Sequence, residues 1–177
     1  MYFPIILNTN KKVLIIGAGN VSLRKTKKLL EFTDKIKVVS SEFHEAFDNL
    51  NIEKLKMEVT EENFPMLLNE EICFVILSLN NKELNKNLCK ICKHYNLLVN
   101  VVDNKDISDI IFPAVIEREN LLLAISTKGK CPYYSKKLKE ELTEFINRKE
   151  TEAKILINSR KKGEILDETY GRIKRGL

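Results

Sequence analysis

The sequence has no apolar run long enough to cross a bilayer. Its longest apolar stretches, residues 13–16 and 74–77, fall well short of a membrane-spanning helix. The first residues also lack the basic stretch and apolar core of an export signal. Internal repeats and low-complexity tracts are missing, which excludes a repeat array. We therefore expect a cytoplasmic protein with reduced cysteines and no membrane partner.

Cysteine and histidine are too sparse for an evident metal or redox cluster. There are four cysteines and two histidines. Cys89 and Cys92 have the CxxC spacing, yet they lie inside an expected helix, whereas redox pairs stand at a helix start. A zinc site would need two further ligands, and only His94 is close in sequence. We therefore interpret the pair as helix packing and predict no metal site.

The balance of charge is basic. The chain of 177 residues has 30 lysines and arginines against 25 acidic residues, a net charge of +5, and 44% of its residues are hydrophobic. This hydrophobic fraction is typical of a globular protein, and the length allows one good-sized core with an appendage. The positive charge suits an anionic partner, but on charge alone nucleic acid, phosphates and polycarboxylates all remain open.

Apolar strands alternate with helical patterns through the first part of the chain. Strands are predicted at residues 12–16, 35–39, 55–59, 72–77 and 97–102. Helices are predicted between them, at residues 20–32, 42–50, 65–68 and 82–94. This alternation predicts an α/β fold, a Rossmann domain whose parallel sheet is covered on both faces.

The pattern changes after residue 103. Residues 110–116 and 121–126 are two strands separated by four residues, which indicates a β-hairpin. Pro113 cannot donate to a sheet ladder, so the first strand is expected at an edge or with a bulge. A helix at residues 133–148 follows, and a charged, helix-prone stretch ends the chain. A hairpin appended to a Rossmann sheet is a natural place for subunit pairing.

We therefore divide the chain into three parts. Residues 1–108 form the Rossmann domain, residues 109–147 a dimerisation segment, and residues 148–177 a short helical C-terminal region.

A glycine turn follows the first strand and opens the first helix. Its sequence is Gly17-Ala-Gly19-Asn20-Val21-Ser22, with Ser22 in place of the third glycine of the usual dinucleotide-binding fingerprint. Backbone N–H groups at such a helix start face a bound pyrophosphate. The alternative is a purely structural turn, and the strand, turn and helix together favour nucleotide binding.

The second strand ends at Ser40-Ser41-Glu42, about where a ribose-binding acid is placed in this fold. These side chains can reach a 2′-hydroxyl. No arginine follows closely to bind a 2′-phosphate, so the sequence favours NAD over NADP.

Two further segments carry polar groups at strand ends. Asp103 follows an apolar strand, where a carboxylate could take a proton or hold a cationic ring nitrogen. Capping of the following loop is the alternative. Ser126, Thr127, Lys128 and Gly129 follow the hairpin and suit an acidic ligand, although a polar turn needs none.

Four blocks of sequence resemble one known family. They are residues 3–5 with 17–25, residues 99–103, residues 112–114 and residues 124–132. Together they resemble precorrin-2 dehydrogenase, which also occurs as the N-terminal part of siroheme synthase. The resemblance runs from Phe3 to about Phe145.

The resemblance assigns roles to these residues. It implies that Gly17, Gly19, Asn20 and Val21 hold the NAD pyrophosphate, and that Ser41 and Glu42 border the adenosine ribose. It also implies that Asp103 is catalytic and that residues 126–129 contact precorrin-2.

The resemblance further implies a homodimer joined through about residues 110–145, with a small tetrapyrrole as substrate and no nucleic-acid partner. The implied reaction is NAD-dependent oxidation of precorrin-2 to sirohydrochlorin. Some members of the family also insert ferrous iron into sirohydrochlorin.

Three features depart from the family pattern. Cys131 stands where a serine is usual, residues 78–81 replace a threonine and aspartate pair, and the C-terminal helical region is short. An NAD-sensing regulatory dimer without catalysis is the alternative function. Another nicotinamide oxidoreductase has less support, because the Tyr133 and Lys137 pair has a reductase spacing but lies after the hairpin.

Overall fold

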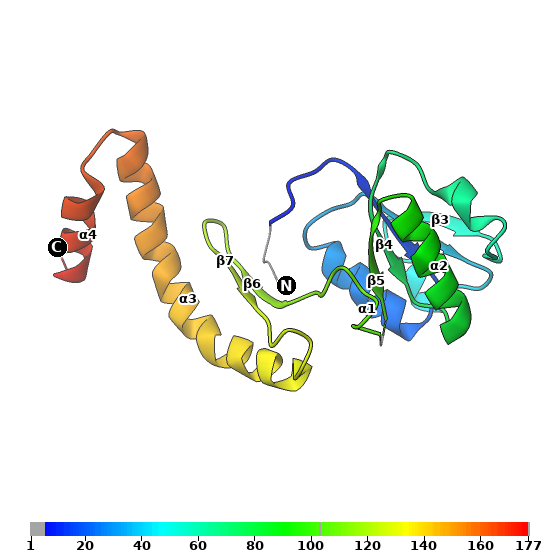
Figure 1. The fold of residues 1–177 in the computed structure, drawn as a ribbon. Helices are drawn as coiled ribbons and strands as arrows, with labels where there is room; N and C mark the ends of the chain where they lie inside the picture. Colours follow the sequence, from blue (N-terminus) through cyan, green and yellow to red (C-terminus); the bar gives the residue numbers. More distant parts are fainter. Residues whose placement is uncertain (1–5, 103, 177) are drawn as a thin grey trace. The chain divides into compact units, whose positions relative to one another are not determined.

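The computed structural model describes residues 6–102 and 104–176. The chain separates into two compact units, Met1–Ile111 and Phe112–Leu177, shown in Figure 1. Asp103 lies outside the described residues. Among those that are described, no helix is both long and apolar enough to cross a membrane.

The first unit is built on a parallel sheet of five strands in the order β3-β2-β1-β4-β5 (Figure 1). The strands are β1 (Lys12–Ile16), β2 (Ile36–Ser40), β3 (Glu53–Lys56), β4 (Ile72–Leu77) and β5 (Leu98–Val101). This topology confirms the predicted α/β fold with a Rossmann-like sheet.

One helix covers each face of this sheet. Helix α2 (Lys82–His94) contributes Leu88, Cys89 and Cys92 to the apolar core on one face. Helix α1 (Asn20–Leu29) packs Leu23 and Leu29 against the core on the other face. The central strands β1 and β4 are almost wholly apolar because both of their faces are buried.

The helix predicted at residues 42–50 is wrong. A single 3₁₀ turn, η1 (Glu45–Phe47), occupies this connection, and β3 begins at Glu53. Phe47 is fully buried and anchors the turn in the core, so the short connection between β2 and β3 is filled without a full helix. Residues 65–68 likewise fall mostly in a 3₁₀ turn, η2 (Phe64–Leu67), anchored by the buried Phe64.

The second unit starts with the predicted hairpin. Strands β6 (Ala114–Glu117) and β7 (Leu122–Ile125) are antiparallel, with Ala114 opposite Ile125 and Glu117 opposite Leu122. Pro113 directly precedes β6, so its missing N–H group does not interrupt the ladder.

A long helix, α3 (Pro132–Lys161), follows the hairpin, and α4 (Leu166–Lys174) completes the unit. Helix α3 continues past residue 148, where its predicted end lay, and stops just before Gly163, whose φ is +75°. The division of the chain into three functional parts stays a prediction.

Side chains tie the hairpin to the middle of α3. Arg118 donates from Nε to Asn147 Oδ1 over 2.6 Å. The backbone N–H and side-chain amide of Asn120 both donate to Glu150 Oε1, over 2.9 and 2.5 Å. The hairpin and α3 are therefore packed together within this unit.

Candidate functional site

The carboxyl ends of β1, β2 and β4 meet at one edge of the sheet. Backbone hydrogen bonds run from Gly17 N–H to the Val39 carbonyl (2.8 Å) and from Ser78 N–H to the Ile16 carbonyl (2.9 Å). We call this edge, residues 17–20, 41–44 and 78–81, the carboxyl edge. The strand order reverses between β1 and β4, and ligands of open α/β sheets bind at such a reversal.

Gly17 starts the turn in a conformation that favours glycine. Its φ is +98°, and a Cβ atom there would lie 2.7 Å from the carbonyl oxygen of Ser78. The turn can therefore pass close to the end of β4 only because residue 17 has no side chain.

Gly19 lies at the N-cap of α1 and has no such constraint. Its φ is −85°, and a Cβ atom there would meet no atom of the described chain within 4 Å apart from those of its immediate neighbours in sequence. Neither backbone strain nor a neighbouring residue thus requires glycine at this position. An open approach to the backbone is what a pyrophosphate needs at this glycine, so the turn fits a dinucleotide.

The start of α1 is electrostatically suited to an anion. Gly19 provides no side-chain cap, and the first turn, which includes Asn20 and Val21, has no acidic residue. The first N–H groups of a helix have no partner within the helix and carry partial positive charge. Asn20 and Val21 therefore stand where the sequence predicted pyrophosphate contacts.

Ser41 and Glu42 lie beside the glycine turn. Both are exposed, and they stand between Val39, which accepts from Gly17 N–H, and His44, whose N–H donates to the Ala18 carbonyl over 3.0 Å. The structure thus brings these two predicted ribose contacts to the same edge as Gly17 and Gly19. A carboxylate there can accept hydrogen bonds from ribose hydroxyls.

The segment after β4 is also part of this edge, although the sequence indicated only that it departs from the family pattern. Ser78 Oγ lies 2.6 Å from Ser22 Oγ in the first turn of α1. The feature of the sequence that could have indicated it is its place directly after the apolar run of β4, because ligands of parallel α/β sheets bind at the carboxyl ends of strands.

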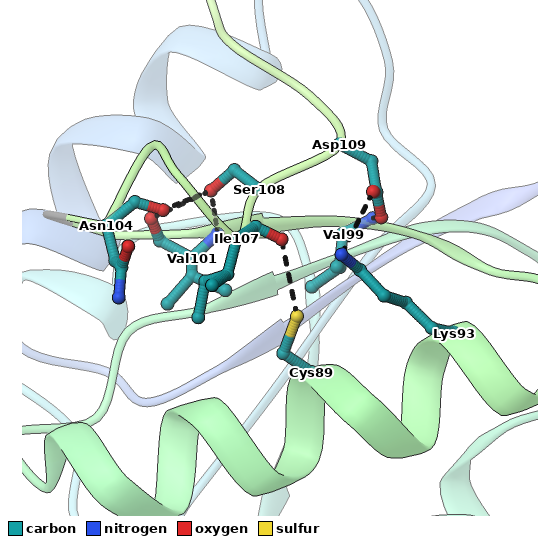
Figure 2. A network of polar contacts seen from close by, with 8 residues as sticks. All are labelled: Cys89, Lys93, Val99, Val101, Asn104, Ile107, Ser108 and Asp109. Carbon is teal, nitrogen blue, oxygen red and sulfur yellow. Dashed lines mark hydrogen bonds and ion pairs between the residues drawn. The ribbon is translucent and has the colours of Figure 1, made fainter.

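The chain around position 103 is held by a network of polar contacts, shown in Figure 2. Ser108 Oγ accepts from Val101 N–H (2.9 Å) and donates to the Asn104 carbonyl (2.7 Å). One hydroxyl therefore anchors the described residues on both sides of Asp103, the predicted catalytic residue, which itself lies outside the described part of the chain.

The same network covers the outer edge of β5. Asp109 Oδ2 accepts from Val99 N–H (3.2 Å), and its other oxygen lies 3.4 Å from Lys93 Nζ of α2 (Figure 2). Cys89 Sγ donates to the Ile107 carbonyl over 3.5 Å. The backbone N–H groups of Asp109 and Ile110 also donate to the Val99 carbonyl, over 2.8 and 3.2 Å, so the segment after residue 106 covers the edge of β5 without forming a further strand.

Cys89 and Cys92 belong to the core. Burial raises the pKa of both thiols, that of Cys92 to about 12. Within residues 6–102 and 104–176, no group of three or more His, Cys, Asp or Glu side chains is placed to hold a metal ion. The two thiols fill space on the inner face of α2.

The predicted substrate segment forms a tight turn in the second unit. Lys128 and Gly129 have φ of +56° and +71°, and Lys130 N–H donates to the Thr127 carbonyl over 3.0 Å. Ser126 Oγ accepts from Lys128 N–H (3.0 Å), and Thr127 Oγ1 accepts from Cys131 N–H (2.9 Å). Both hydroxyls therefore shape the turn that carries Lys128.

Comparison with known proteins agrees with this geometry. Residues 5–114 match the sequence model of a family described as "Putative NAD(P)-binding". The siroheme synthase of Buchnera aphidicola subsp. Acyrthosiphon pisum is 33% identical over 149 residues, which cover 84% of this chain and 31% of that protein. The siroheme synthase of Pseudoalteromonas translucida is 31% identical over 146 residues, or 82% and 31% of the two chains. The chain thus spans about a third of the length of these relatives.

A solved structure is also similar. The structure of SirC, a precorrin-2 dehydrogenase, superposes with a TM-score of 0.68 at 27% identity, and the match covers 90% of this chain and 79% of that one. The family match, from residue 5 to residue 114, takes in more than half of the chain and all of the carboxyl edge. The chain therefore belongs to the NAD(P)-binding family.

Proposed function

We propose that this chain oxidises precorrin-2 to sirohydrochlorin with NAD⁺. The observation that carries the proposal is the likeness to SirC over 90% of the chain. Nucleotide-binding units of the Rossmann type serve many reactions, so the first unit alone would not select one. The likeness extends well beyond Ile111 into the second unit, which supports a shared substrate as well as a shared cofactor.

The cofactor is assigned to the carboxyl edge. The open backbone at Gly19 and the N–H groups of Asn20 and Val21 would hold the pyrophosphate. Ser41 and Glu42 would bind the adenosine ribose, and a carboxylate there favours NAD over NADP. Bound NAD⁺ supplies the hydride acceptor for the oxidation.

We assign to Asp103 the proton that the substrate loses together with the hydride. Oxidation of precorrin-2 removes one hydride and one proton, and a carboxylate at the end of β5 can accept the proton or orient the macrocycle. Ser108 anchors the described residues Val101 and Asn104, which flank Asp103 in the sequence.

We assign substrate binding to the second unit. Precorrin-2 carries carboxylates around its rim, and the turn at Ser126, Thr127, Lys128 and Gly129 carries a lysine whose charge suits them. The net charge of +5 adds a general attraction for such a substrate.

The second unit also supports a homodimer. Helix α3 has 30 residues, of which only Ser135 and Ser159 are buried, while Tyr133, Tyr134 and Phe145 are exposed by 45% to 69%. A helix with so little core of its own gains most from burial against a second copy. Light scattering coupled to size exclusion should give twice the mass of the chain, and a monomer at micromolar concentration would contradict this assignment.

Replacement of Asp103 tests the catalytic assignment. Asp103→Asn and Asp103→Ala should lower turnover of precorrin-2 by roughly a hundredfold or more, the usual contribution of a general base. The dissociation constant of NADH should stay within about twofold, because the carboxyl edge is unchanged. Unchanged turnover would remove Asp103 from the mechanism.

A regulatory dimer that senses NAD is the alternative function. It would bind NADH and leave precorrin-2 unchanged in the same assay. Insertion of ferrous iron and a cytoplasmic location stay predictions.

A further inference from the structure

We infer that Ser22 and Ser78 form a positioning bridge that sets the NAD affinity of the carboxyl edge. Their hydroxyl oxygens lie 2.6 Å apart, and either hydroxyl can donate. The inference rests on the proposed cofactor site. It assigns a role to two residues that stand outside the predicted set of cofactor contacts.

Ser22 occupies the third position of the glycine fingerprint. That position is usually glycine or alanine so that the helix can pack closely on the strand. Ser22 is fully buried, so its hydroxyl is not on the surface that a bound nucleotide would contact. A buried hydroxyl without a partner is costly, and Ser78 provides the partner.

Ser78 begins the segment that forms the other side of the edge. Its N–H donates to the Ile16 carbonyl over 2.9 Å, which continues the pairing of β4 with β1. Next to it, Leu79 is held by the buried side chain of Asn85 on α2. Asn85 Oδ1 accepts from Leu79 N–H (3.2 Å), and Asn85 Nδ2 donates to the Leu79 carbonyl (2.8 Å).

Side chains of two helices thus hold the segment that begins at Ser78. Asn85 holds it from α2, and Ser22 holds it from the first turn of α1, the turn whose N–H groups would bind the pyrophosphate. At Gly17 the clearance between the glycine turn and the Ser78 carbonyl leaves no space for a methyl group. The bridge therefore fixes the start of α1 relative to the end of β4 without touching the nucleotide.

Thr26 provides a matched control on the same helix. It lies one turn after Ser22 and is fully buried as well, and its hydroxyl has no hydrogen-bond partner among the described residues. Thr26→Val removes a buried hydroxyl without breaking a bridge. Its effect measures the cost of altering the helix alone.

The test measures NADH binding by fluorescence titration, together with thermal unfolding. Ser22→Ala and Ser78→Ala should each raise the dissociation constant of NADH roughly threefold to tenfold, the range expected for one hydrogen bond between uncharged groups. The double variant should be no weaker than either single variant, because both remove the same bond. Ser78→Thr retains a hydroxyl and should bind as the unaltered protein does, and so should Thr26→Val.

Three results would overturn the inference. One is unaltered NADH affinity in Ser22→Ala and Ser78→Ala, even if their melting temperatures fall, since this would show a purely structural bond. Another is a simple sum of the two effects in the double variant. The third is an equal loss of affinity in Thr26→Val. Absence of NADH binding to the unaltered protein would instead contradict the proposed function, so the two failures are distinguishable.

Discussion

A Cβ atom on Gly17 would lie 2.7 Å from the carbonyl oxygen of Ser78, a separation that real Cβ contacts essentially never show. Gly19, two residues later, has no atom of the described chain near its own Cβ position apart from those of its immediate neighbours in sequence. One glycine is thus required by the fold, and the other leaves room for a ligand.

Alanine substitutions at these two glycines should affect different properties, stability at Gly17 and NADH affinity at Gly19. Gly17→Ala should destabilise the first unit by roughly 2–3 kcal/mol, because it adds a contact with Ser78 and places alanine at φ +98°. Gly19→Ala should change stability by less than about 0.5 kcal/mol, yet raise the dissociation constant of NADH by roughly tenfold or more. Denaturant unfolding and NADH titration of both variants make the comparison. Equal affinity for NADH in Gly19→Ala would argue against a pyrophosphate at this turn.

Glu42 should control the choice of cofactor. Glu42→Ala removes a carboxylate that can bond ribose hydroxyls, so NAD affinity should fall roughly tenfold, and the relative affinity for NADP should rise. Glu45→Ala is the control, because Glu45 is exposed in the same connection but lies farther along, in η1. Parallel titrations with NADH and NADPH give the ratio. If the ratio of NADH affinity to NADPH affinity is similar in the unaltered protein, in Glu42→Ala and in Glu45→Ala, the ribose is bound elsewhere.

Lys128 has a backbone conformation that is unfavourable for its side chain. Its φ of +56° lies in the left-handed region, which asparagine tolerates better. Lys128→Asn should therefore stabilise the second unit by up to about 1 kcal/mol and raise the KM for precorrin-2, because a positive charge is lost. Thermal unfolding and steady-state kinetics measure the two effects. A more stable variant with unaltered KM would show that Lys128 does not contact the substrate.

The four thiols should differ in reactivity. Cys131 is exposed, whereas burial raises the pKa of Cys73, Cys89 and Cys92. With a pKa of about 12, the Cys92 thiol is almost fully protonated at pH 8 and is a poor nucleophile. A disulfide reagent at that pH should label Cys131 first and Cys92 only after unfolding. Rapid labelling of Cys89 and Cys92 in the folded protein would favour a redox role for the pair.

The fold could largely be predicted because its signals are local. Strand β4 and helix α2 have the predicted bounds, residues 72–77 and 82–94, since an apolar run ends in polar residues and Asn81 caps the helix through its side chain. Helix α3 was predicted too short, because the apolar spacing fades after residue 148 although no glycine or proline interrupts it before Gly163.

The candidate site was predictable only where it is continuous in sequence. The glycine turn follows β1 directly, and Ser41 and Glu42 follow β2. The contact between Ser22 and Ser78 joins residues 56 positions apart, so no local pattern indicates it. The same holds for Asn120 and Glu150, which join the hairpin to α3.

The most direct test of the proposed function is an anaerobic assay of the unaltered protein with precorrin-2 and NAD⁺. NADH absorbance and the sirohydrochlorin spectrum are followed together, and ferrous iron is added at the end. We predict equal amounts of NADH and sirohydrochlorin, formed only when the protein and NAD⁺ are both present. NADH binding without any sirohydrochlorin would contradict the dehydrogenase and favour the regulatory dimer.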